Sequence, residues 1–87
     1  NDLKAVQEKL KVQKMEISEM EDEIEATNIA IAELSTKYFE TNQQEYLDRM
    51  NEKKAEYEKL YTQYTEKVKE YNALNTQYKK KAGGEGQ

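Results

Sequence analysis

The 87-residue sequence contains no cysteine, no histidine, no proline and no tryptophan, and only three glycines. Without cysteine, the chain has no disulfide framework, no thiolate nucleophile and no zinc–thiolate site. Without histidine, it lacks the commonest general base and the commonest metal ligand of proteins. We therefore expect a non-enzymatic protein with no catalytic residues, no metal ligands and no cofactor.

Other partner classes are also disfavoured by what the sequence lacks. No stretch approaches about 18 consecutive apolar residues, so no transmembrane helix is predicted. The net charge is −4, and no basic patch is interleaved with aromatic residues, so we expect no nucleic-acid partner. Carboxylates along a helix neither wrap a cation nor form a substrate pocket, so we expect no small-molecule substrate. Lysines near both ends suit solvated helix ends, and we do not expect membrane contact as the function. Nothing in the sequence indicates a cellular compartment.

The composition is typical of long helices. Ala, Glu, Lys, Leu and Arg make up 42 of the 87 residues, close to the roughly 50% found in coiled coils. Leu, Ile, Val and Phe number only 14, which is low enough to raise the question of disorder. Order is expected only if these few apolar residues recur at helical spacing.

The apolar residues of the first half recur every seven positions. This series runs from Leu3 to Tyr38, and further apolar residues lie three positions after some of its members. Such a pattern, held for about five heptads, predicts a coiled-coil helix. Polar residues interrupt the second row at Gln13, Thr27 and Thr41. They either specify register or leave the seam loosely defined.

A second series of period seven runs from Met50 to Tyr78 in the other half. Leu47, Tyr61 and Val68 fall three before or four after its members, while Leu60 and Leu74 widen the stripe. The predicted interface or core residues of the two halves are Leu3, Val6, Leu10, Ile17, Met20, Ile24, Ile31, Leu34, Tyr38, Leu47, Met50, Tyr57, Leu60, Tyr61, Tyr64, Val68, Tyr71, Leu74 and Tyr78.

The two series do not share a phase, which indicates a break near residues 39–45. Tyr38 and Leu47 are nine residues apart, a shift that no single stutter or stammer produces. Asn42 followed by Glu45 resembles a capping box and predicts the start of a second helix there. The near-equal halves favour an all-α antiparallel helical hairpin, with arms about 2–40 and 43–82, that self-associates into a bundle. The alternative is a continuous long-helix dimeric rod.

At the other end, three lysines precede Ala82, Gly83 and Gly84, which predicts a helix end with Gly83 or Gly84 in the left-handed conformation. We expect residues 1–82 to form the helical module and 83–87 a flexible glycine-rich tail. Because the chain begins with Asn1 rather than Met, we expect it to be part of a longer protein.

The first helix is expected to have a second apolar face. Val12, Met15, Ala26 and Ile29 lie outside the main seam, and Met15 is about 160° around a helix from Ile17. They are either scattered surface residues or a second interface. Since a two-helix hairpin has little core of its own, self-association, most simply a homodimer, is predicted. Another helical protein is the alternative partner.

The sequence has seven tyrosines and one phenylalanine. Because a tyrosine hydroxyl can stay in contact with water, this composition indicates a more hydrated seam than one built from leucine.

Charge is distributed in blocks along the sequence. Residues 1–14 carry +2, residues 67–87 carry +3, and the stretch between them carries −9.

Residues 3–81 resemble, in heptad composition alone, the helical hairpins of bacterial secretion adaptors and cell-wall-hydrolase regulators. Long eukaryotic cytoskeletal or trafficking coiled coils show the same composition. We predict a non-enzymatic structural and oligomerisation segment of a larger protein, acting as a scaffold or spacer. The alternative is a protein–protein docking module, such as a helical hairpin adaptor of the bacterial cell envelope or secretion machinery, which would bind through the second face or through the turn at residues 41–44.

Overall fold

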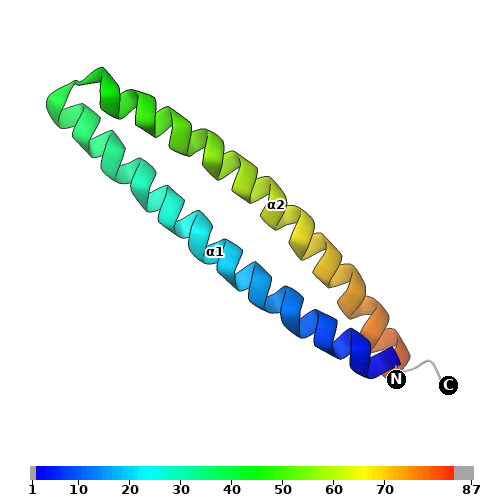
Figure 1. Cartoon of the computed structure of the whole chain (residues 1–87). Coiled ribbons are helices and arrows are strands. Elements are labelled where there is room, and N and C mark those ends of the chain that lie inside the picture. Colours follow the sequence, from blue (N-terminus) through cyan, green and yellow to red (C-terminus); the bar gives the residue numbers. More distant parts are fainter. Residues whose placement is uncertain (1, 84–87) are drawn as a thin grey trace.

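The computed structural model describes residues 2–83, and these form two long antiparallel helices (Figure 1). Helix α1 spans Asp2–Thr41 and helix α2 spans Gln44–Gly83, each 40 residues long. The molecule measures 66 × 15 × 14 Å, and the first and last described residues lie at the same end, which we call the base. The all-α helical hairpin predicted from the sequence is therefore confirmed, and the chain is not a continuous rod.

The chain forms helices because nothing inside either arm interrupts them. Neither arm contains proline, and the glycines come only after residue 82. Along each helix the half-buried side chains recur three to four residues apart, so one stripe of each helix faces the other. Burying this stripe, more than helix propensity, stabilises helices of this kind.

The turn consists of Asn42 and Gln43, and Asn42 makes the reversal. Its φ is 57°, in the left-handed region, and its backbone N–H donates to the carbonyl of Tyr38 at 2.7 Å. This bond ends α1 with a left-handed cap residue, a position that asparagine tolerates better than most residues. The Thr41 hydroxyl accepts a hydrogen bond from the Gln43 N–H at 3.3 Å and donates to the carbonyl of Lys37 at 2.8 Å.

The predicted capping box is therefore wrong about the role of Asn42. Asn42 ends the first helix instead of capping the second, because its left-handed conformation is what turns the chain. The carbonyl of Gln43 accepts the first bond of α2, from the N–H of Tyr46 at 3.1 Å. Glu45 pairs with Arg49 one turn later, at 2.8 Å between Oε1 and Nη2.

The carboxyl end of α2 also differs from the expectation. Gly83 is the last residue of the helix and has no positive φ, so it is not the left-handed residue after the cap. Lys80 and Lys81 occupy the last turn, where the helix dipole favours positive charge. Gly84 and the rest of the predicted tail lie outside the described residues.

The turn geometry predicts opposite effects of two substitutions at one position. Asn42→Ala should destabilise the hairpin by about 1 kcal/mol, because alanine in the left-handed region costs about that much. Asn42→Gly should be neutral or stabilising, since glycine has no Cβ to clash there. Urea unfolding followed by circular dichroism measures both. Gln43→Ala, which has no positive φ to lose, is the control. Equal stability of the alanine and glycine variants would contradict this account of the turn.

Candidate functional site: the seam and the outer face of the first helix

The seam between the helices contains nearly all the side chains assigned to it from the sequence. Leu10 and Met50 are buried, each 8% exposed, and no described side chain is completely enclosed. The other predicted residues that the structure brings together are half-buried, namely Leu3, Val6, Ile17, Met20, Ile24, Ile31, Leu34, Tyr38, Leu47, Tyr57, Leu60, Tyr64, Val68, Tyr71, Leu74 and Tyr78. The seam is thus long and only one side chain deep on each helix.

Tyr61 is the exception, because it lies beside the seam and is 50% exposed. It follows Leu60, which faces α1, and one residue later the helix has turned by about 100°. Its ring stacks on Tyr57 with centroids 6.0 Å apart, and it meets Tyr64 at 6.1 Å. Tyr61 therefore joins a row of aromatic rings along the edge of the seam rather than its core.

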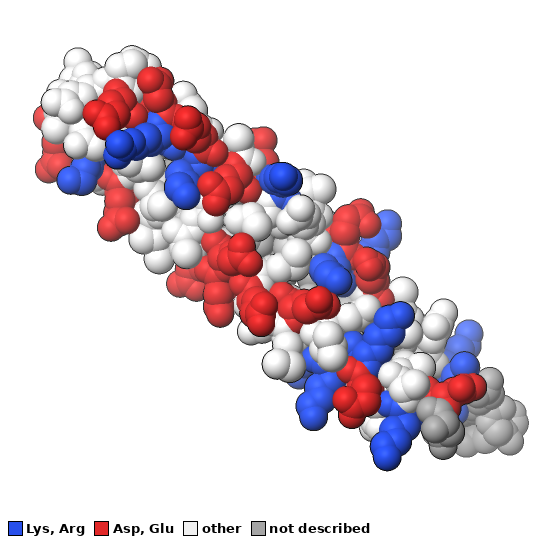
Figure 2. All heavy atoms as spheres, viewed as in Figure 1, with Lys and Arg blue, Asp and Glu red and all other residues white. Residues whose placement is uncertain are grey.

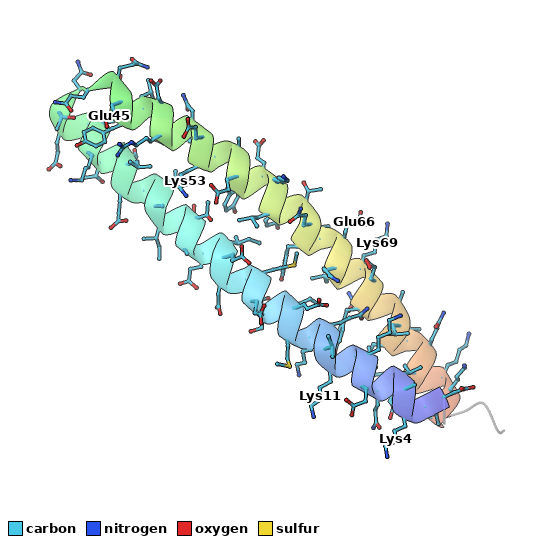
Figure 3. The ribbon with its side chains drawn as sticks, in the orientation of Figure 1. Lys4, Lys11, Glu45, Lys53, Glu66 and Lys69 are labelled. Carbon is cyan, nitrogen blue, oxygen red and sulfur yellow. The ribbon has the colours of Figure 1, made fainter. Side chains whose placement is uncertain are left out.

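The row of α2 that accompanies Met50 and the tyrosines is Lys53, Leu60, Lys67 and Leu74, all half-buried. Sequence reasoning missed the two lysines because their charge argued against a seam position. The spacing of Leu60 and Leu74 could have predicted this row. They are 14 residues apart, and steps of seven from them reach Lys53 and Lys67. A lysine stem can cover apolar surface while its ammonium group stays in water. Figure 3 shows Lys53 between the two helices.

Over residues 2–83, the contacts that cross from one helix to the other include three polar ones. The Tyr64 hydroxyl donates to Oε2 of Glu21 at 2.9 Å. Nζ of Lys67 pairs with Oε1 of Glu16 at 3.3 Å. Nζ of Lys37 lies 6.0 Å from the centre of the Tyr46 ring. Each contact joins residues whose numbers sum to between 83 and 85, so all three support one antiparallel register.

Two polar residues sit inside the seam. Thr27 is 8% exposed, and its hydroxyl donates to the carbonyl of Glu23 at 2.8 Å, which satisfies it within α1. Gln13 is half-buried, and its Oε1 is buried without a hydrogen-bond partner among the described residues. An unsatisfied buried carbonyl destabilises a fold. Thr41, the third polar residue noted from the sequence, is exposed at the turn.

The outer face of α1, pointing away from α2, carries the residues predicted as a second interface. Val12 is 54% exposed, Met15 61% and Ile29 53%, and Ala26 is exposed as well. None of the four contributes to the seam. Phe39, the only phenylalanine, is 90% exposed and lies three residues before the turn.

Charge is separated along the hairpin (Figure 2). Residues 2–14 of α1 hold four lysines and two acidic residues, Asp2 and Glu8. Residues 67–83 of α2 hold five lysines and one acidic residue, Glu70, so both helices are basic at the base. Residues 16–25 of α1 hold six acidic side chains and no basic one. Because the hairpin brings the two basic segments together, the base is positive and the adjoining band of α1 is negative.

A groove of about 560 Å³ runs between the helices near the turn, lined by Ala30, Glu33, Leu34, Lys37, Arg49, Glu52 and Lys53. Over residues 2–83, no group of acidic side chains is arranged to hold a metal ion. Neither described helix has a segment apolar enough to cross a membrane.

The chain matches no protein-family model, no curated protein and no solved structure with which it was compared. Its function is therefore inferred from its surfaces and its shape.

The unsatisfied amide in the seam predicts a stabilising substitution. Gln13→Leu should raise the free energy of unfolding by about 1–2 kcal/mol, because it removes a buried carbonyl without a partner and extends the apolar seam. Urea denaturation measures the change. Gln7→Leu, the same substitution at an exposed position, is the control and should change stability by less than about 0.5 kcal/mol. A loss of stability in the Gln13 variant would show that the amide is satisfied.

The contact between Tyr64 and Glu21 predicts a pH effect. The hydrogen bond to Glu21, with burial and the negative charge of Glu21, raises the pKa of Tyr64 above 10.0. The bond's contribution is complete below about pH 10 and is lost as the pH rises through the raised pKa of the folded state. In an ultraviolet titration of the tyrosines, Tyr64→Phe should remove an ionisation that occurs above the ordinary tyrosine pKa of 10.0. Tyr61→Phe is the control, and loss of the same high-pH step in both variants would contradict the assignment.

Proposed function

We propose that this chain is a non-enzymatic structural module that self-associates and acts as a scaffold or spacer within a larger protein. The observation that carries the proposal is the shortage of core together with the exposed apolar side chains. The hairpin exposes 6834 Å², whereas a compact monomer of 10.3 kDa exposes about 5,400 Å². Self-association covers such excess surface.

The shape supports a role as a spacer. Both ends of the described chain lie at the base, so a larger protein attached there would project the turn outward by the length of a 40-residue helix, about 60 Å. The lateral dimensions of 15 × 14 Å are small beside the length of 66 Å. A module of this form sets a distance through its length.

Sedimentation equilibrium of the full chain over a wide concentration range tests the proposal. We expect a mass that rises from one chain of 10.3 kDa to two as the concentration increases. Unchanged helix content by circular dichroism would show that association does not require refolding. A mass of one chain at all concentrations up to about 1 mM would contradict self-association.

A second candidate function is a docking module that binds another protein through the turn. The observation in its favour is Phe39, which is 90% exposed beside the turn. A hydrophobic dye added to the associated protein separates the two candidates. Fluorescence that Phe39→Ser abolishes would indicate an apolar tip still available to a partner. No dye binding in the associated state would favour the purely structural module.

A further inference from the structure

The outer face of α1 carries one apolar pair at the boundary between two blocks of opposite charge. Val12 and Met15 form this pair and are 54% and 61% exposed. The block before and around them, residues 2–14, carries a net charge of +2, and the block after them, residues 16–25, carries −6. Glu16 and Glu21 of the second block contact Lys67 and Tyr64 of α2, so the other four carboxylates supply −4 to the rest of the helix surface. Lys4 and Lys11 of the first block extend from α1 on the side away from α2 (Figure 3).

This arrangement specifies how a second copy would fit. When two identical helices pair antiparallel about a two-fold axis, a residue of one copy faces the residue of the other copy whose number lies equally far on the opposite side of the axis position. The axis that places the basic block of one copy over the acidic block of the other passes near residue 14. Val12 and Met15 are centred between residues 13 and 14, within one residue of that axis. The same two-fold axis therefore brings together opposite charges and apolar side chains.

We propose that a second copy of this chain docks antiparallel on the outer face of α1, with Val12 of each copy against Met15 of the other and each basic block over the partner's acidic block. This inference rests on the proposed self-association and names its surface and orientation. The attraction between opposite blocks guides the orientation, and the apolar pair is covered at the centre.

Other arrangements of the same face place like charges together. A parallel pair lays one acidic block on the other. An antiparallel pair with full overlap would bring Val12 against Ile29, but it also sets Glu19 against Asp22 at the centre of the contact. Like charges facing each other oppose association, so the charge pattern selects the overlap of the base halves.

The proposed register sets two like-charged pairs across from each other, Asp2 with Glu25 and Glu8 with Glu19, and the second pair can be used to test it. Glu8 of one copy lies across from Glu19 of the other, because their numbers sum to 27, as those of Val12 and Met15 do. Glu8→Lys turns this repulsion into attraction at two symmetric places. The dissociation constant of the dimer should fall by about threefold to tenfold, and the gain should shrink at high salt.

Glu33→Lys is the matched control. It makes the same charge change at an exposed residue of α1 that borders the groove near the turn, beyond the proposed overlap, so the dissociation constant should stay within about twofold. In the fully overlapped register Glu33 would face Glu8 of the partner, and both variants would then strengthen the dimer. That result would overturn the proposed register, and no effect of Glu8→Lys would overturn the proposed surface.

A distance measurement tests the orientation independently. Because the chain has no native cysteine, Gln7→Cys, at an exposed position, carries one spin label per copy. At about 1.5 Å per residue, the proposed dimer separates the two labels by about 20 Å along the axis. The fully overlapped pair would separate them by about 40 Å, and a parallel pair by about the 10 Å between helix axes. Only the first distance supports the proposal.

Different results would overturn the proposed self-association and the proposed docking surface. A single-chain mass in sedimentation overturns the proposed self-association and this inference together. A two-chain mass with spin labels at 10 or 40 Å leaves the self-associating module in place and overturns only the antiparallel docking through Val12 and Met15.

Discussion

The structure depends on one interaction, the mutual burial of a single stripe of side chains along two antiparallel helices. Every described helical residue belongs to α1 or α2, so each stripe has only the other helix to cover it. Most seam residues stay half-buried, and among the described residues only Leu10, Thr27 and Met50, each 8% exposed, are buried. A seam of this kind must be long to be stable, because each level of the hairpin buries only a few side chains. The length of the arms, 40 residues each, therefore contributes directly to the stability of the fold.

The turn makes this long seam possible with two residues. Asn42 supplies the left-handed conformation, and its bond to the carbonyl of Tyr38 satisfies a carbonyl that the end of α1 would otherwise leave open. Because the connection has only two residues, it fixes which residues of α1 face which residues of α2 next to the turn. The contacts of Tyr64 with Glu21 and of Lys67 with Glu16 lie far from the turn and keep the same register.

Folding the chain back on itself also creates the charge separation on which association is proposed to rest. The lysines of residues 2–14 and 67–83 are far apart in the sequence and adjacent at the base of the hairpin. The acidic residues 16–25 lie immediately beyond. A continuous rod would place the two lysine-rich segments, 2–14 and 67–83, at opposite ends. The hairpin brings them together, so the molecule has a positive base and a negative band beside it. The seam leaves Val12 and Met15 uncovered between them.

The sequence by itself determined the element type, the two seam rows that begin at Leu3 and Met50, and the break between them. These follow from local spacing, because a residue seven positions on returns to nearly the same side of a helix. Which residues flank those rows was decided only by the tertiary structure. Tyr61 is apolar enough for the seam yet lies outside it, because the position of α1 sets which side of α2 is covered. Lys53 and Lys67 lie inside the seam, because a lysine stem can line an apolar surface. The role of Asn42 also depends on the tertiary structure, since a residue at a helix boundary can end one helix or begin the next. The left-handed backbone conformation of Asn42 shows that it ends the first helix.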